Sequence, residues 1–459
     1  MDLMRPSRFV SLSALVVVLL LLAVGTAAPQ SAPAGPARLA VTEATLDNGL
    51  RVLVQEDPRN PIVAVQIFYR VGSRNELPGA TGLAHFLEHM MFKGTPTRGR
   101  GQISRLIEQN GGRDNAFTTK DVTGYYVNIA ADRLDLVLGV EADRMRNLLL
   151  DAGEIDSERQ VVMEERRSRI DDDPEGVIYE AMSSLAYVAH PYRAPIIGWM
   201  ADIARINRGE LRAFYDTYYR PNNAILVVVG DVAGPEILGR VRRLFGGIAR
   251  GPEPPPVAAI EPPQIDERRV VVKKPSAQVP IVNVSWHVPN FRSVDAPALD
   301  LLSTILSEGR ASRLYRKLTY ERRLALGAGG DYSYFSLNPN LFWLYATPLP
   351  GRTPEVLEQA LLAEIELVKA EPIPAEEIQR AKNQVEASFV WRQDSVHSRG
   401  SALARFELLG SWRLAETYLP LVRAVTAGDL QRVARAYFPT DRKNTAILLP
   451  ATPAAPAEK

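Results

Sequence analysis

Two histidines that flank a glutamate at helical spacing are the residues of this chain best suited to metal chemistry. His85, Glu88 and His89 lie in a segment of the order H-x-x-E-H. Residues four apart occupy one face of an α-helix, so both imidazoles can reach the same metal ion. Glu88 lies near the rim of that face, where its carboxylate can hydrogen-bond a water on the metal without binding the metal. With a third protein ligand, one tetrahedral position stays open for water, as is typical of a catalytic zinc site.

The third ligand has to come from outside this helix. The chain contains no cysteine, so the ligand must be a histidine or a carboxylate. The richest candidate is the acidic helical stretch 154–165, in which Glu158 and Glu165 are seven residues apart and share a face. Spacing alone does not choose between these two glutamates.

The remaining histidines and a cluster of tyrosines are expected to be structural, because none has a partner at ligand spacing. They are His190, His287, His397, Tyr215, Tyr218 and Tyr219. The acidic run 171–173 before Pro174 predicts a solvated turn, because it lacks the ligand spacing of a calcium-binding loop.

The elements that must position the motif occur twice along the chain. An alternating strand followed by a helix is predicted at 62–69 and 82–92, and again at 280–287 and 296–306. Each copy closes with a helix and a strand, at 208–219 and 223–230 and then at 427–438 and 444–449. This long-period similarity indicates a duplicated domain. We expect an α+β fold of two homologous halves, each an antiparallel β-sheet with helices packed on one face.

A proline-rich stretch separates the two copies and sets the predicted domain boundaries. We place a catalytic zinc-binding half at 41–249, a linker at 250–267, a non-catalytic half at 268–450 and a disordered tail at 451–459. In the second half, residues 298–306 occupy the place of the H-x-x-E-H helix and offer neither histidine nor glutamate. The chain is therefore expected to bind one zinc ion.

The N-terminus has the composition of an export signal. Arg5 and Arg8 precede an apolar run at 9–24 and small residues at 25–28, which predicts a cleaved signal peptide at 1–27 and a flexible leader at 28–40. An uncleaved membrane anchor is the less favoured alternative, because the run is short for a span. The predicted location is periplasmic or extracellular, with no membrane span after cleavage. A net charge of +1 argues against nucleic acid as a partner.

The segment 85–95 resembles the active-site segment of the insulinase/pitrilysin metallopeptidases, a family that includes the mitochondrial processing peptidase β subunit and exported bacterial members. Further matching segments are 111–118, 190–192, 197–198 and 219–231, and the resemblance spans both halves. It implies Glu165 as the third zinc ligand and Glu158 as a carboxylate that supports a ligand histidine. It also implies that Asn115, Ala116, Phe117 and Thr118 form an edge strand that pairs with the extended substrate.

The resemblance further implies a zinc-dependent endopeptidase that hydrolyses peptides or unfolded polypeptides. Glu88 would act as the general base and then as the general acid. Two other functions stay open: a zinc-binding but weakly active scaffold or assembly subunit, and a peptide-binding protein.

One feature of the family is missing. Related enzymes carry an arginine and a tyrosine seven residues apart in the second half, where they contact the substrate carbonyl. Thr319 and Leu326 stand at these positions here, and whether Arg322 or Arg323 substitutes is left open. Loss of such a donor typically costs ~10²–10³ in rate. We therefore expect a homologous partner chain without metal that supplies the Arg/Tyr pair, with a homodimer as the alternative.

Overall fold

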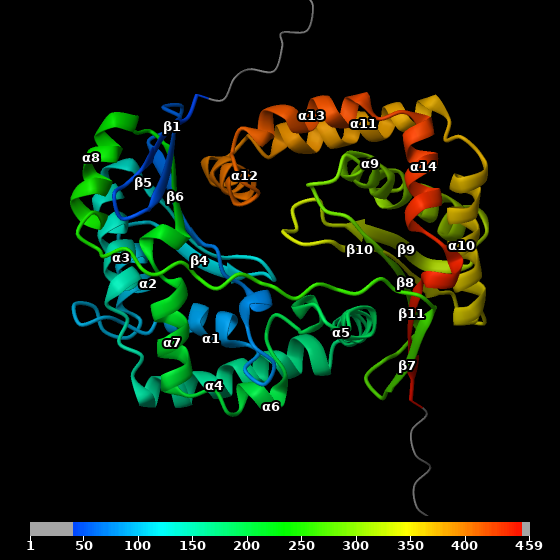
Figure 1. The fold of residues 1–459 in the computed structure, drawn as a ribbon, viewed down its shortest axis with the longest axis horizontal. Coiled ribbons are helices and arrows are strands. Elements are labelled where there is room, and N and C mark those ends of the chain that lie inside the picture. The colour runs from blue at the N-terminus through cyan, green and yellow to red at the C-terminus, as the bar shows by residue number, and fades with distance from the viewer. Residues whose placement is uncertain (1–39, 452–459) are drawn as a thin grey trace, which may run out of the picture. The chain divides into compact units, whose positions relative to one another are not determined.

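The computed structural model describes residues 40–451 of the 459-residue chain. The predicted signal peptide, the leader up to residue 39 and the tail from residue 452 lie outside the described residues. The described chain is built from the two homologous halves predicted above, each with one sheet, and the α+β fold class is confirmed (Figure 1).

The first half provides six strands and the helices that surround them. The strands are β1 (Thr42–Thr45), β2 (Arg51–Glu56), β3 (Ile62–Tyr69), β4 (Arg113–Thr118), β5 (Thr123–Ala130) and β6 (Ala224–Gly230). The helices are α1 (Leu83–Met90), α2 (Gln102–Gln109), α3 (Leu134–Arg146), α4 (Ala152–Arg166), α5 (Pro174–Ala186), α6 (Met200–Ile203), α7 (Arg208–Tyr218) and α8 (Gly234–Phe245).

The second half repeats this plan with five strands. They are β7 (Arg268–Lys274), β8 (Ile281–Val288), β9 (Ala325–Tyr332), β10 (Asn340–Pro348) and β11 (Asn444–Pro450). Its helices are α9 (Ala296–Ser307), α10 (Pro354–Ala370), α11 (Ala375–Trp391), α12 (Val396–Leu408), α13 (Leu414–Ala424) and α14 (Ala427–Tyr437).

The two sheets have matching strand orders. The first runs β1-β2-β6-β3-β5-β4 and the second β7-β11-β8-β10-β9, so β4 and β9 are equivalent edge strands. Most neighbours are antiparallel, as predicted. One pair in each sheet, β2 with β6 and β7 with β11, is parallel. In each pair an early strand of the half meets its last strand, which returns in the same direction after a long excursion through helices.

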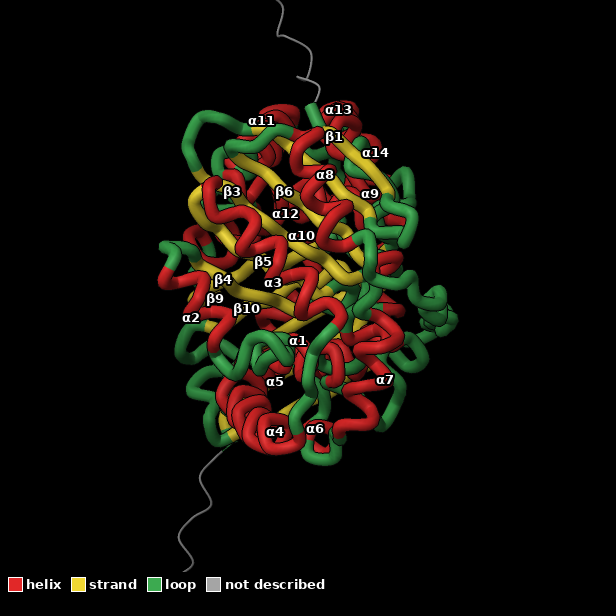
Figure 2. Tube along the Cα trace, turned by 90° about the vertical axis from the view of Figure 1, so that its left-hand side faces the viewer, coloured by secondary structure: helices red, strands yellow, loops and turns green. Residues whose placement is uncertain are grey.

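Alternation along β3 shows how the first sheet is covered. Val63, Val65 and Ile67 join the main apolar core with residues of α1, α3 and α8. In Figure 2, α3 and α8 lie in front of the first sheet. Successive side chains point to opposite faces of a strand. Gln66 therefore faces the other way, where its amide donates to the carbonyl of His397 at 2.7 Å.

Each half contributes one helix to the free face of the other half's sheet. Helix α12 of the second half packs on β3 and β6, whereas α5 of the first half packs on β7, β8 and β11. Val177, Ile178 and Met182 of α5 form a core cluster with residues of the second sheet. The expectation of helices on one face was thus incomplete, because an exchanged helix covers the second face.

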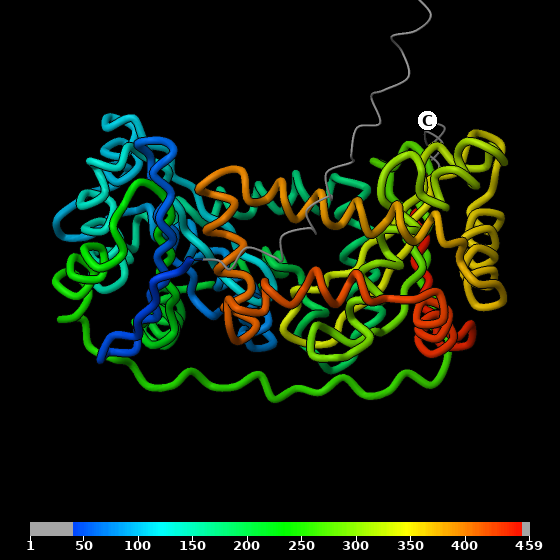
Figure 3. Tube along the Cα trace, turned by 90° about the horizontal axis from the view of Figure 1, so that it is seen from above, coloured from blue at the N-terminus to red at the C-terminus, as the bar shows by residue number. Residues whose placement is uncertain are grey.

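The segment between the halves contains no helix or strand from residue 246 to residue 267. Figure 3 shows it as an extended green stretch of the tube that runs along one side from the first half to the second. It is held by side-chain contacts. The carboxylate of Glu261 accepts hydrogen bonds from the backbone N–H groups of Val188, Ala189 and His190, each at 2.9 Å. No helix among residues 40–451 combines the length and apolarity that a membrane crossing needs.

Candidate metal centre

Helix α1 carries the histidine motif, and its start is fixed by a carboxylate and a close backbone contact. Both oxygens of Glu76 accept hydrogen bonds, one from the N–H of Gly82 and one from that of Ala84, each at 2.8 Å. Gly82 has φ +91°, and a Cβ there would lie 2.6 Å from the carbonyl oxygen of Ile197. The chain enters this helix through a position that only glycine fits well.

The three predicted ligands come together. His85 Nε2 lies 3.7 Å and His89 Nε2 lies 3.4 Å from Oε2 of Glu165, and the three ligand atoms all lie within 4.8 Å of one another. A tetrahedral zinc with bonds of about 2.0–2.2 Å places neighbouring ligand atoms about 3.3–3.6 Å apart. The donor set and its spacing therefore fit zinc. Glu165, which spacing alone did not distinguish from Glu158, is the glutamate that meets both imidazoles.

Glu158 lies behind His89. Its Oε1 is 2.8 Å from Nδ1 of His89, and its other oxygen forms an ion pair with Lys93. Helix α4 brings Glu158 there because α4 packs against α1. Glu158 is buried on α4 together with Ile155 and Val162. A carboxylate on the second ring nitrogen fixes the tautomer of a metal-binding histidine and directs the other nitrogen to the metal.

Glu88 lies beside the ligand cluster without joining it. Its side chain is buried, and its Oε2 accepts a hydrogen bond from the Thr118 hydroxyl at 2.5 Å. Burial raises the pKa of Glu88 above its ordinary value, and the bond from Thr118 only partly opposes this. A carboxylate with a raised pKa is suited to accept and release a proton near neutral pH.

In the metal-free protein the pKa values of the two histidines are shifted in opposite directions. Burial, with His89 close by, lowers the pKa of His85 to about 4, so His85 is neutral and ready to bind a metal. Burial also disfavours the charge of His89, but bonds to Glu158 and Glu165 outweigh it and raise the pKa of His89 to about 9. A metal ion bound here would displace that proton.

Strand β4 lies at the edge of the first sheet, next to α1. It pairs with β5 on one side, from Arg113 opposite Asn128 to Thr118 opposite Thr123, and it is the last strand in the sheet order. Ala116 packs against the main core and Thr118 reaches Glu88, whereas Phe117 points to the other face and packs edge-on against Phe68. Asn115 bends its side chain back to the N–H of Ala116 at 2.8 Å.

The other histidines lie away from the ligand cluster and make local contacts. His190 accepts a bond from the N–H of Tyr192, His287 donates to the carbonyl of Ala186 and His397 meets Gln66. The tyrosines 215, 218 and 219 are buried. The acidic turn has a structural role as well, since Asp173 caps α5 by accepting from the N–H of Gly176.

The positions of the missing Arg/Tyr pair lie on a π-helical turn and on β9. Among residues 40–451, neither Thr319 nor Leu326 forms a hydrogen bond or ion pair with the ligand cluster, and neither do Arg322 and Arg323. Leu326 is about half exposed (51%) and Arg323 adopts φ +48°. None of these four residues therefore contacts the ligand cluster within the described chain.

Three contacts at this site were not predicted from sequence. Lys93 pairs with Glu158, Arg169 pairs with Oε1 of Glu165 at 3.1 Å, and Thr118 donates to Glu88. Lys93 and Arg169 each follow a predicted site residue, His89 or Glu165, by four positions, a spacing that points to a shared helical face. Thr118 had no such signal, because its contact joins a strand to a helix.

Two family models match the chain. "Insulinase (Peptidase family M16)" matches residues 51–199, and "Peptidase M16 inactive domain" matches residues 205–385. A Helicobacter pylori protein named zinc protease PqqE is 34% identical over 410 residues, which cover 88% of this chain and 92% of the relative. An uncharacterized zinc protease of Mycobacterium tuberculosis is 31% identical over 430 residues, 92% of this chain and 96% of the relative.

Solved structures show the same fold. The crystal structure of a protease from Helicobacter pylori superposes with a TM-score of 0.86 at 32% identity, covering 89% of this chain and 99% of that one. The periplasmic protease PqqL from Escherichia coli gives a TM-score of 0.73 at 20% identity, and it covers 90% of this chain but 49% of PqqL. The chain thus resembles about half of the PqqL protein.

Proposed function

The chain belongs to the insulinase family of peptidases, and from this premise we propose that it is an exported zinc-dependent endopeptidase that hydrolyses peptides or unfolded polypeptides. One observation carries the proposal: two imidazole nitrogens and a carboxylate oxygen converge at zinc-ligand spacing, with Glu88 beside them and the edge strand β4 alongside. The similar proteins named zinc proteases support the same metal and the same class of reaction.

We assign metal binding to His85, His89 and Glu165, and orientation of His89 to Glu158. Bound zinc would supply a Lewis acid that activates water and polarises the scissile carbonyl. Glu88 accepts a proton from the attacking water and passes it to the leaving amine. The raised pKa of Glu88 supports this role, because the carboxyl has to hold the proton between the two transfers. The bond from Thr118 orients Glu88 toward the reacting groups.

The substrate binds as an extra strand on the open edge of β4. Main-chain hydrogen bonds hold such a peptide whatever its sequence, which suits a broad range of unfolded substrates. Side chains of the bound strand alternate between the two faces of the sheet. On the face of Phe117 lies a cavity of about 410 Å³, whose aromatic walls include Phe68, Tyr179 and Trp343 and which has room for a large apolar side chain.

A second chain completes the site. Thr319 and Leu326 cannot stabilise a developing oxyanion as an arginine and a tyrosine do, since Leu326 has no polar group and Thr319 is short and uncharged. We propose that a homologous subunit without metal supplies this pair, with a homodimer as the alternative. The same substitutions favour a second candidate function, a zinc-binding scaffold with little turnover, whereas the buried base beside the ligand cluster disfavours it.

A peptide library separates these functions. The chain alone and the chain mixed with candidate homologues are each assayed with and without a chelator. We expect weak cleavage by the chain alone, a rise of roughly 10²–10³ with the correct partner, and loss of both with the chelator. Full activity of the single chain would refute the two-chain proposal, and no cleavage with any homologue would favour the scaffold. Peptide binding that survives chelation without any cleavage would indicate a binding protein.

Export is proposed from the N-terminal segment. Expression of the full-length chain in a Gram-negative host, followed by fractionation and N-terminal sequencing, should give a periplasmic protein that begins near residue 28. An unprocessed cytoplasmic or membrane-bound product would contradict this part of the proposal.

A further inference from the structure

The two halves touch each other through equivalent hairpins. The turn between β4 and β5 spans residues 119–122, and the turn between β9 and β10 spans residues 333–339. Both hairpins form the same edge of their sheets, because β4 and β9 occupy equivalent places in the strand order. Only the first hairpin includes the strand that we propose binds the substrate.

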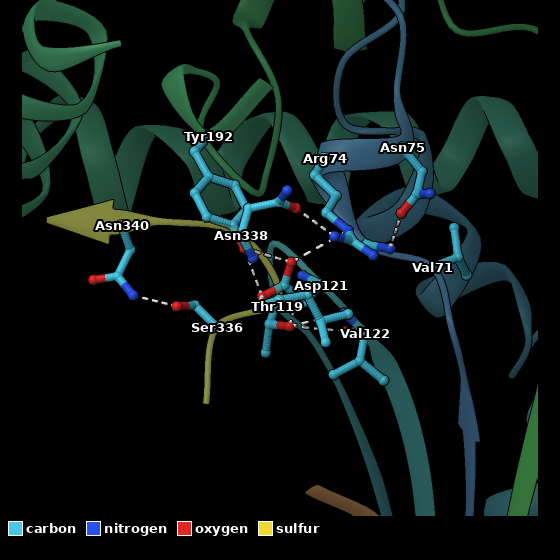
Figure 4. A network of polar contacts seen from close by, with 12 residues as sticks. Val71, Arg74, Asn75, Thr119, Asp121, Val122, Tyr192, Ser336, Asn338 and Asn340 are labelled. Carbon is cyan, nitrogen blue, oxygen red and sulfur yellow. Dashed lines mark hydrogen bonds and ion pairs between the residues drawn. The ribbon is translucent and has the colours of Figure 1, made fainter. Parts of the chain in front are cut away.

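Asp121 lies at the centre of this contact (Figure 4). Its carboxylate accepts two contacts from the Tyr192 hydroxyl, at 2.6 and 2.8 Å, and one from the backbone N–H of Leu337 at 3.0 Å. Arg74 adds an ion pair at 3.2 Å. Tyr192 and Arg74 belong to the first half, whereas Leu337 belongs to the turn of the second half. Asp121 therefore joins the two hairpins directly.

Asn338 closes the network from the other side. Its side-chain oxygen accepts a hydrogen bond from Arg74 at 2.5 Å, and its backbone N–H donates to the Tyr192 hydroxyl at 3.3 Å. In Figure 4 Arg74 reaches from one side toward both Asp121 and Asn338. The Asp121 and Arg74 side chains are about 15% exposed, so these bonds are well shielded from water.

The same turn of the first half is tied to the zinc-binding helix. The N–H groups of Ser73 and Arg74 donate to the carbonyls of Thr119 and Lys120, at 3.1 and 3.0 Å. A few residues later Glu76 accepts from the first turn of α1. The segment 72–76 thus bonds the hairpin on one side and the start of α1 on the other. Arg74 links this segment to the second half.

We infer that the half without metal positions the substrate strand. Its Asn338 contacts Arg74 and its Leu337 contacts Asp121, and these bonds hold the β4–β5 hairpin at a fixed place relative to α1. This inference rests on the proposed peptidase function. An edge hairpin with one ladder partner is among the first parts of a sheet to fluctuate. If the hairpin is mobile, the peptide has to order it on binding, which weakens affinity. Contacts made by the second half remove that cost in advance.

The test uses the full chain with Glu88→Gln, so that binding is measured without turnover. Asn338→Ala removes the acceptor for Arg74 from the second half, and Asp121→Ala removes the central carboxylate. Asp132→Ala is the matched control, since Asp132 is a largely exposed carboxylate (69%) just beyond the other end of β5. The measurements are the Kd for a fluorescent unfolded peptide, hydrogen exchange at residues 113–126, and zinc affinity.

We expect Asn338→Ala and Asp121→Ala to raise the peptide Kd about fivefold and to speed exchange at residues 113–126, with zinc affinity nearly unchanged. The control should alter none of these. Unchanged exchange in folded Asn338→Ala protein would overturn the inference, even if Asp121→Ala fails to fold. Faster exchange with an unchanged Kd would also overturn it. If the Glu88→Gln parent binds no peptide, the proposed function fails instead, and exchange alone then decides whether the second half holds the hairpin.

Discussion

Glu158 offers the sharpest test of the proposed metal centre, because it contacts the proposed ligand His89 but does not belong to the ligand cluster. Its Oε1 lies 2.8 Å from His89 Nδ1 and its side chain is 7% exposed. Removing such a carboxylate typically costs ~10–100-fold in metal affinity. Glu158→Gln keeps an oxygen that can accept from Nδ1–H but loses the negative charge, so we expect a loss near the lower end, about tenfold. Glu158→Ala removes both and should lie near the upper end, about 100-fold.

The assay is zinc competition against a chromophoric chelator, with the fold checked by circular dichroism. Glu164→Ala is the control, since Glu164 lies on the same helix, beside the proposed ligand Glu165, and is 71% exposed. Its zinc affinity should match that of the wild type. The order wild type, Gln, Ala follows from the two separate contributions of Glu158. If both variants bound zinc within about twofold of the wild type, Glu158 would not support His89, and our account of the site would be refuted.

Three further results are expected. Dialysis against a zinc chelator should abolish peptide cleavage, and stoichiometric Zn²⁺ should restore it; activity that survives complete metal removal would contradict the proposed mechanism. Glu88→Gln should lower kcat by ~10²–10⁴ while zinc content, measured by atomic absorption, stays at the wild-type level. Burial raises the pKa of Asp300 from 3.8 to about 6, which favours the protonated acid in the folded state. Its contribution to stability should therefore be lost as pH rises from about 4 to about 6. Urea unfolding should show this as a fall of at most about 3 kcal/mol for the wild type relative to Asp300→Asn, and equal pH profiles would argue against a raised pKa.

The parts of the site that share one helix could be read from the sequence. His85, Glu88 and His89 are close in the chain, and helical periodicity alone places them on neighbouring faces. Glu165 needed more, because two glutamates on one face of α4 are equivalent until the angle between α1 and α4 is known. Packing decides the question: Glu158 lies behind His89 and Glu165 lies beside both imidazoles.

The contacts between the halves could not be predicted in this way. The apolar face of α5 is the same pattern whether it covers its own sheet or the other one, so periodicity is silent about the exchange. Asp121 is similar, since an aspartate in a hairpin turn is ordinary turn chemistry. Its role depends on Leu337, which lies 216 residues away in the chain.

The exchange of α5 and α12 means that the duplication produced one folding unit with two interlocked lobes. A protease that cut the segment 246–267 would sever the covalent connection without separating the fragments, because each fragment would still insert a helix into the other. Either lobe made by itself would expose the sheet face that the helix of the other lobe covers. In the first lobe this face includes the side-chain amide of Gln66. Each lobe therefore completes the core of the other, and its stability depends on the presence of its partner lobe.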